Sequence, residues 1–334
     1  MRKRLSVVEY TKGILSGDRV VLSRAITVIE SKLDSDKVLA KQILREILPF
    51  SGNSIRIGIT GVPGVGKSTF IETFGKHLTS LGKRVAVLTI DPSSKRSGGS
   101  ILGDKTRMET LSNDSLAYIR PSAARLSLGG VADNTRETML LCEAAGFEVI
   151  IIETVGVGQS EILVHGMTDF FLLLMLAGAG DELQGIKKGI IEMADVLVIN
   201  KADGANQNIA EEAMGTYRNA LHLSPKSASG HITQVVTASG LEGKGIPELW
   251  NMISDYQKLT SDNGYFIRNR QSQNLDWMHE RIRQALESAF YENSVIKRSI
   301  PEIEKLVREE TELPVVAAER LLALFLTKKS EEPI

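Results

Sequence analysis

Short apolar runs alternate with longer amphipathic stretches through the middle of the chain, from residue 54 to about residue 258. Most runs are continuously apolar, as in strands that are covered on both faces. Helical segments separate most of them, so right-handed crossovers and a largely parallel sheet are expected. The runs are Ile55–Thr60, Val85–Ile90, Leu116–Ile119, Val149–Glu153, Phe170–Leu176, Val196–Asn200 and Thr233–Thr237. The pattern predicts an α/β domain with a mostly parallel sheet flanked by helices.

Apolar positions follow helical spacing on both sides of this region. The N-terminal positions include Val20, Ile26, Ile29 and Leu33, and the C-terminal ones include Leu275, Met278, Ile282, Leu286 and Phe290. Ser299-Ile300-Pro301-Glu302 has the composition of a helix start, and Pro314 is expected to open another helix. We therefore expect an N-terminal helical extension over residues 1–53, a central domain over 54–260 and a C-terminal helical segment over 261–334.

Composition limits the class of protein. The 334 residues include 40 basic and 41 acidic side chains, so no strong field favours nucleic acid or an anionic membrane. The single cysteine, Cys142, excludes an intramolecular disulfide and fits a reducing cytoplasm. The most apolar run, Phe170 to Gly178, is far shorter than the roughly 20 residues of a membrane helix. A cytoplasmic protein without membrane insertion is expected.

The segment Gly61-Val62-Pro63-Gly64-Val65-Gly66-Lys67-Ser68 matches the phosphate-binding motif GxxxxGK[ST]. It follows a predicted strand and opens a helical stretch, which is the context that this motif requires. Glycines let backbone N–H groups surround phosphate oxygens, and the helix N-terminus adds partial positive charge. Lys67 is expected to bridge the β- and γ-phosphates and Ser68 to bind Mg²⁺, with Thr69 completing the nucleotide-binding segment. A glycine-rich turn without function is the alternative.

A second motif, NKxD, follows the predicted strand Val196–Asn200. Asp203 can accept two hydrogen bonds from guanine, whereas adenine offers no such pair of donors. Lys201 can lie along the base, and Asn200 can tie this loop to the phosphate-binding loop. After the last predicted strand, Ser239-Gly240-Leu241 occupies the place where GTPases carry a short loop that contacts the guanine carbonyl, with glycine in place of the usual alanine. A solvated loop is the alternative for NKxD.

Three acidic residues are candidates for the metal site. Glu153 ends a buried strand and can hold Mg²⁺ directly or through water, although most GTPases carry Asp there. Asp91 and Asp104 lie in or beside a Ser- and Gly-rich stretch suited to a mobile switch, where a turn-forming Asp is the alternative. The Gly156 amide can sense the γ-phosphate, and Gln159 can orient the attacking water or be an ordinary polar loop residue.

Together these motifs resemble the methylmalonyl-CoA mutase-associated GTPase chaperone family, also called the ArgK type. The segments that carry the resemblance are Gly61–Phe70, Asp91–Ser94, Gly98–Met108, Leu141–Glu161, Gly178–Ile190 and Asn200–Asp203. The resemblance implies a homodimeric, Mg²⁺-dependent GTPase that binds GTP and GDP. It further implies that the chain gates cofactor delivery to an adenosylcobalamin-dependent mutase and protects that mutase. By the same resemblance, the C-terminal helices form a dimerisation arm, and residues 178–188 form an additional switch.

Other functions remain as alternatives. The family carries an older label as an ATPase or kinase that serves basic amino-acid transport, which a guanine-reading Asp203 disfavours. A nickel metallochaperone is disfavoured because His and Cys residues are dispersed along the sequence. A protein-targeting GTPase is disfavoured by only 9 Met and a neutral charge balance.

Overall fold

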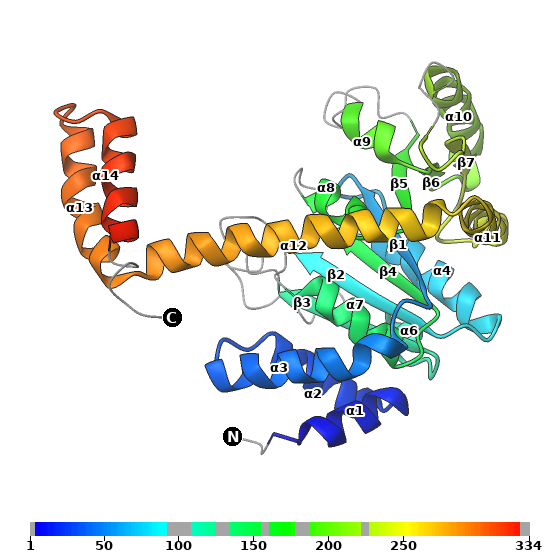
Figure 1. The fold of residues 1–334 in the computed structure, drawn as a ribbon. Coiled ribbons are helices and arrows are strands. Elements are labelled where there is room, and N and C mark those ends of the chain that lie inside the picture. Colours follow the sequence, from blue (N-terminus) through cyan, green and yellow to red (C-terminus); the bar gives the residue numbers. More distant parts are fainter. Residues whose placement is uncertain are drawn as a thin grey trace. The chain divides into compact units, whose positions relative to one another are not determined.

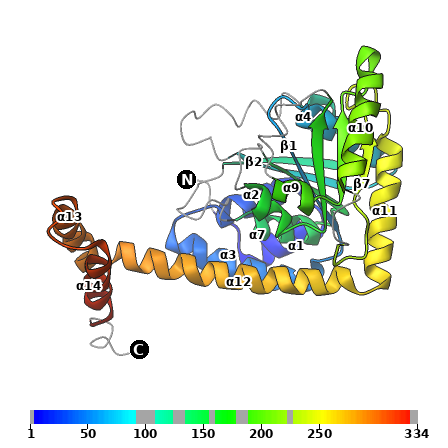
Figure 2. The same ribbon diagram turned by 90° about the horizontal axis from the view of Figure 1, so that it is seen from above.

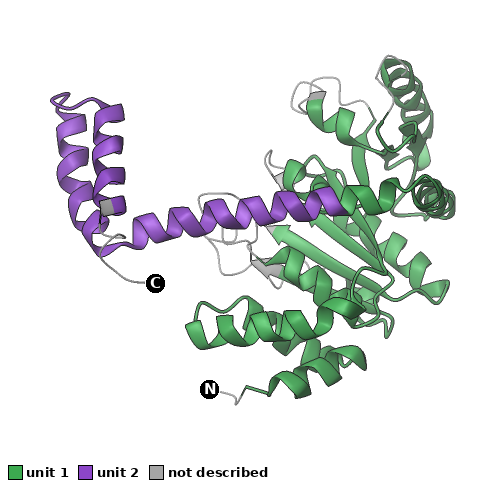
Figure 3. Ribbon diagram, viewed as in Figure 1, with its two compact units in different colours: residues 1–270 green, residues 271–334 purple. Residues whose placement is uncertain are grey.

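The computed structural model describes residues 4–91, 108–123, 134–154, 160–177, 188–221 and 227–327. Two compact units make up the chain, residues 1–270 and residues 271–334 (Figure 3).

A parallel sheet forms the centre of the first unit (Figure 1). Its seven strands in the described residues have the order β3-β2-β4-β1-β5-β6-β7, and every neighbouring pair is parallel. The strands are β1 (Ile55–Gly61), β2 (Val85–Asp91), β3 (Ala117–Ala123), β4 (Val149–Thr154), β5 (Phe170–Leu176), β6 (Val196–Asn200) and β7 (Gln234–Thr237). Each predicted apolar run forms one of these strands, so the predicted fold class is confirmed.

Helices cover both faces of the sheet and enclose two apolar cores (Figure 2). One face packs against α4 (Lys67–Ser80), α6 (Glu109–Ser112) and α11 (Ile246–Asp262). The helices on the other face are α1 (Val7–Leu15), α2 (Arg19–Ile29), α3 (Asp34–Ile47), α7 (Thr135–Ala144), α8 (Ser160–His165), α9 (Lys188–Met193) and α10 (Gln207–Leu221). The short 3₁₀ helices η1 (Leu48–Phe50) and η4 (Gly204–Asn206) complete these connections.

The N-terminal helices pack against α7 and thereby join the core of the first unit. A capping box starts α1, because Ser6 accepts from the Glu9 amide while the Glu9 carboxylate accepts from the Ser6 amide. The Asp18 side chain caps α2.

A buried ion-pair network holds the amino ends of β1 and β5. Arg56 on β1 donates to Glu143 on α7, and the Glu143 side chain is fully buried. Asp169, just before β5, accepts from the Arg56 backbone amide and from the guanidinium of Arg270. Every charge in this network therefore has a partner of opposite sign, which buried charges require.

The second unit contains most of α12 (Tyr265–Glu292), together with α13 (Ser294–Arg308) and α14 (Pro314–Thr327). Phe290 and Phe325 pack edge to face, with ring centroids 5.4 Å apart. Pro314 begins α14 as expected, but the predicted helix start at Ser299 is wrong. Asn293 caps α13 by accepting from two backbone amides, and Pro301 lies inside the helix. Within the described part of the chain, no helix combines the length and apolar composition needed to cross a lipid bilayer.

Candidate nucleotide-binding site

The sequence motifs converge at the carboxyl edge of the sheet. Because β4, β1, β5 and β6 are neighbours, the ends of these parallel strands lie side by side. Glu153 near the end of β4, the loop after β1 and Asn200 at the end of β6 therefore share one edge. In open parallel sheets this edge is where ligands bind.

Glycine is required at two positions of the loop between β1 and α4. Gly61 has a φ of 154°, and a Cβ there would lie 2.5 Å from the Leu174 carbonyl oxygen on β5. Gly66 has a φ of 90° and stands immediately before the first residue of α4. The loop therefore approaches β5 closely and then turns into a helix whose N-terminal amides face the same edge.

The Lys67 side chain folds back over this loop. Its ammonium donates to the carbonyl oxygens of Gly61 at 2.7 Å and Val62 at 3.2 Å. Burial lowers the pKa of Lys67, and the negative charges of Glu153 and Glu161 act against that shift. Lys67 thus places a cation against the loop that the sequence predicts to bind phosphate. The remaining segment runs through Val62, Pro63, Gly64 and Val65 to Thr69, which is exposed in the first turn of α4.

Two oxygen donors suited to Mg²⁺ lie beside Lys67. The Ser68 hydroxyl is 3.4 Å from Glu153 Oε1, and Glu153 is only 7% exposed. The adjacent Thr154 hydroxyl donates to Thr60 on β1 at 2.7 Å, which fixes the ends of both strands. Mg²⁺ takes hard oxygen ligands and usually combines one or two protein groups with phosphate and water. The donor set of Ser68 and Glu153 fits that ion.

The loop after β6 is joined to the phosphate-binding loop by two side chains. Asn200, which is 2% exposed, donates to the Val65 carbonyl at 2.8 Å and accepts from the Gly240 amide at 3.1 Å. Lys201 donates to the Gly64 carbonyl at 2.9 Å. Its φ of 59° is uncommon for a residue other than glycine, and such strain clusters at functional sites.

Asp203 and the loop after β7 form a second junction. The Ser239 hydroxyl donates to Asp203 Oδ2 and accepts from the Glu242 amide. The structure gives a physical reason for glycine at 240, since a Cβ there would lie 2.9 Å from the Phe70 Cα. Leu241 is 78% exposed. Ser239 therefore orients the carboxylate that is predicted to read guanine.

Several predicted site residues lie outside the described residues. These are Asp104, Gly156, Gln159 and the proposed switch residues 178–187, together with the side chain of Asp91.

Sequence reasoning assigned no role to Glu161, the first acidic residue after the Gly156–Gln159 segment. It lies in α8, is 3% exposed, and its negative charge opposes the lowering of the Lys67 pKa by burial. In the sequence, Glu161 could have been identified as a candidate because it ends the Leu141–Glu161 segment that carries the family resemblance. A buried acid near Lys67 makes Glu161 a positioning candidate for the phosphate-binding cation.

Comparison with known proteins places the chain in a family. The family described as "Methylmalonyl Co-A mutase-associated GTPase MeaB" matches residues 22–295. The chain belongs to this family of GTPases. The resemblance predicted from the motifs is thereby confirmed.

Members and neighbours of the MeaB family align along nearly the whole chain. A "Putative GTPase" of Caulobacter vibrioides is 52% identical over 321 residues, which cover 96% of this chain and 98% of that protein. The mouse "Methylmalonic aciduria type A homolog, mitochondrial" is 42% identical over 329 residues, covering 96% and 79%. The solved "LAO/AO transport system kinase" has a TM-score of 0.77 and 34% identity, covering 98% and 99%.

Proposed function

We propose that this GTPase is a chaperone for an adenosylcobalamin-dependent acyl-CoA mutase. In this proposal it gates delivery of the cofactor and protects the mutase, and methylmalonyl-CoA mutase is the partner to test first. The main support for this proposal is the match to the MeaB family over residues 22–295, because that family is described by its association with this mutase. The name of the mouse relative points to the same metabolism. We place this activity in the cytoplasm.

We propose that the carboxyl edge of the sheet binds GTP and GDP with Mg²⁺. The segment Gly61–Thr69 holds the phosphates, with Lys67 neutralising their charge, and Ser68 and Glu153 hold the metal. When bound, Mg²⁺ neutralises charge that develops on the phosphate oxygens. Asp203, oriented by Ser239, reads the guanine ring, while Asn200 and Lys201 keep this loop against the phosphate-binding loop. Asp91, Asp104, Gly156, Gln159, Gly240 and Leu241 complete the proposed site.

We further propose a homodimer formed through a C-terminal arm over residues 261–334. Leu275, Met278, Ile282 and Leu286 lie on one side of α12, and each is between 47% and 57% exposed. An apolar stripe at this spacing is typical of helices that pack against a partner. The proposed organisation keeps an N-terminal extension over 1–53 and a GTPase domain over 54–260.

A second candidate is an ATP-dependent kinase, because the solved structural neighbour is named as a transport system kinase. The geometry around Asp203 supports the GTPase instead. Ser239 orients the Asp203 carboxylate, and Asn200 joins the same loop to the phosphate-binding loop. Adenine offers no pair of donors to such a carboxylate, so an ATP site does not require it. The base specificity of turnover separates the two functions.

The deciding experiment compares Mg²⁺-dependent hydrolysis of GTP and ATP with and without purified methylmalonyl-CoA mutase. We expect selectivity for GTP and faster turnover when the mutase is present. Asp203→Asn serves as an internal control. Turnover stimulated by the mutase should require XTP in this variant, and such a change of substrate shows that this chain carries out the hydrolysis. A preference for ATP contradicts the assignment of Asp203 to guanine recognition. GTP turnover that is equal with and without the mutase contradicts the chaperone role.

A further inference from the structure

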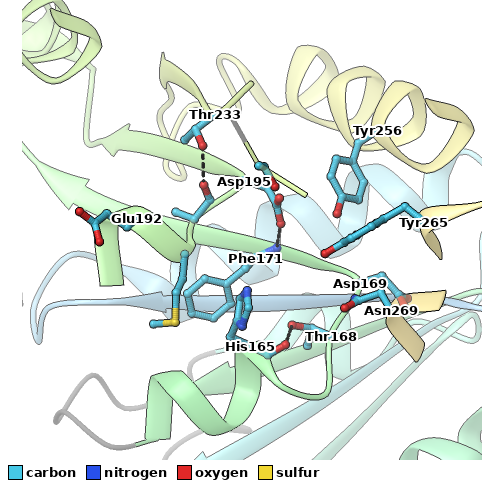
Figure 4. A pocket seen from close by; sticks show the side chains of 13 residues that line it. His165, Thr168, Asp169, Phe171, Glu192, Asp195, Thr233, Tyr256, Tyr265 and Asn269 are labelled. Carbon is cyan, nitrogen blue, oxygen red and sulfur yellow. Dashed lines mark hydrogen bonds between the residues drawn. The ribbon is translucent and has the colours of Figure 1, made fainter. Parts of the chain in front are cut away.

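A small cavity lies at the amino edge of the sheet, whereas the phosphate-binding loop lies at the carboxyl edge. Figure 4 shows the side chains that line this cavity. Part of its polar lining comes from the amino ends of three strands, with Asp169 before β5, Asp195 before β6 and Thr233 before β7. The volume is about 210 Å³, or roughly seven water molecules at about 30 Å³ each. Since β5 has seven residues at about 3.3 Å each, the two edges are roughly 20 Å apart. The cavity is therefore separate from the nucleotide site.

Among the lining residues that the structure describes, none supplies a positive charge to the carboxylate of Asp195. Asp169 already accepts from Arg270 and from the Arg56 amide. Asp195 Oδ2 accepts from the Phe171 backbone amide at 2.8 Å, which satisfies a hydrogen bond but supplies no positive charge. The described lining contains Glu192 at its edge and no lysine or arginine. A poorly solvated carboxylate in such a setting gains from a cation brought by a ligand.

The histidines near the cavity do not supply that cation. Burial lowers the pKa of His165, whose ring packs edge to face on Phe171. Burial likewise lowers the pKa of His231, whose Nε2 meets the Asp195 carbonyl at 3.0 Å. Both rings are therefore neutral near pH 7.

Aromatic side chains form the rest of the recognition surface. The hydroxyl ends of Tyr256 and Tyr265 lie toward Asp195, with the Phe171 ring below them (Figure 4). Burial raises the pKa of Tyr265, so its hydroxyl stays protonated and neutral, with lone pairs that can accept from an N–H group. Aromatic faces also attract cations. Asp195 beside two tyrosines, with Glu192 only at the cavity edge, suits an organic cation better than a divalent metal, which takes several oxygen ligands.

We propose that this cavity binds the ammonium or guanidinium group of a small amine, with Asp195 as its counter-ion. The described lining has no positive group that could pair with a carboxylate on the ligand. An amine should therefore bind better than the corresponding amino acid, which carries an α-carboxylate. The source of the cation is either a free amine or a lysine or arginine side chain of a protein. The proposal is independent of the mutase partner and of the nucleotide site.

Calorimetric titration of the full chain with putrescine and agmatine tests the proposal. We expect one amine per chain. Ornithine and arginine, which add an α-carboxylate, should bind about tenfold or more weakly, and butanol should not bind. A lysine blocked at its α-amino and α-carboxyl groups, with a free ε-ammonium, distinguishes the two sources of the cation. If it binds more tightly than agmatine, the natural ligand is a protein side chain. If it binds more weakly, the natural ligand is a free amine.

Variants make the test specific. Asp195→Asn and, independently, Tyr265→Phe should each weaken amine binding by about tenfold or more, while Glu192→Gln at the cavity edge serves as the matched control. Far-UV circular dichroism and basal GTP turnover verify that each variant is folded. The proposal fails if neither amine binds the wild-type chain, if butanol binds as well as an amine, or if both folded cavity variants keep wild-type affinity.

Discussion

Replacing Asn200 with alanine should weaken both the fold and nucleotide binding. The Asn200 amide donates to the Val65 carbonyl, and its carbonyl accepts from the Gly240 amide. Both partners belong to loops of the candidate site, and Asn200 itself is 2% exposed. Alanine leaves a buried carbonyl and a buried amide without their partner, at about 1–3 kcal/mol each. We expect the free energy of unfolding to fall by about 2–6 kcal/mol.

Urea unfolding followed by circular dichroism measures this loss, and calorimetry measures the accompanying loss of GDP affinity. Asn200→Asp separates the two bonds, because it keeps an acceptor for Gly240 but turns a carboxylate oxygen toward the Val65 carbonyl. We expect it to be at least as damaging as alanine. Asn219→Ala, on the exposed side of α10, is the matched control and should stay within about 0.5 kcal/mol of wild type. If Asn200→Ala is as mild as that control, the link between the two loops is not stabilising.

Three further predictions concern single side chains. Lys67→Ala should abolish GTP binding or hydrolysis, and normal turnover in a colorimetric phosphate assay would contradict the assignment of the phosphate-binding loop. Asp203→Asn should change the preferred substrate from GTP to XTP in a competition assay, since an amide complements xanthine; an unchanged preference would show that Asp203 does not read the base. Burial raises the pKa of Asp195 from 3.8 to about 7, so its carboxyl binds a proton more tightly in the folded chain than in the unfolded chain. The free energy of unfolding should therefore decrease as the pH rises from about 4 to about 7, and it should level off above pH 7. At about 1.4 kcal/mol per pKa unit, the total decrease is a few kcal/mol at most. Asp195→Asn should reduce this slope in urea titrations across that range, and an identical pH profile would contradict the raised pKa of Asp195.

Local patterns predicted the sheet because most of its strands are covered on both faces. Most of these strands are continuously apolar, so each such run marks a strand without knowledge of its neighbours, whereas β3 and the edge strand β7 include polar residues. The order of the strands depends instead on pairing between distant segments, and it was not predicted. Helix boundaries failed where two local signals competed. Pro301 resembles a first-turn residue, yet Asn293 caps the helix several residues earlier and Pro301 lies inside it.

Motif residues of the candidate site were predictable because each motif is a continuous stretch of sequence. The cavity at the amino edge was not, because its residues have ordinary local contexts. Asp169 and Tyr265 are distant in sequence and meet only through the strand order and the start of α12. Glu161 was missed for a related reason, since its burial near Lys67 depends on how α8 packs beside β1 and β4.

Gly240 shows how a tertiary contact changes the meaning of one residue. From the sequence, glycine in place of alanine is acceptable because the base is contacted through the backbone. In the structure, a methyl group would press on the Phe70 Cα in the helix that starts from the phosphate-binding loop. The Gly240 carbonyl also accepts from Thr73 of that helix, while its amide donates to Asn200. Direct backbone packing thus fixes the loop after β7 to the phosphate-binding helix, so a shift in either one moves the other.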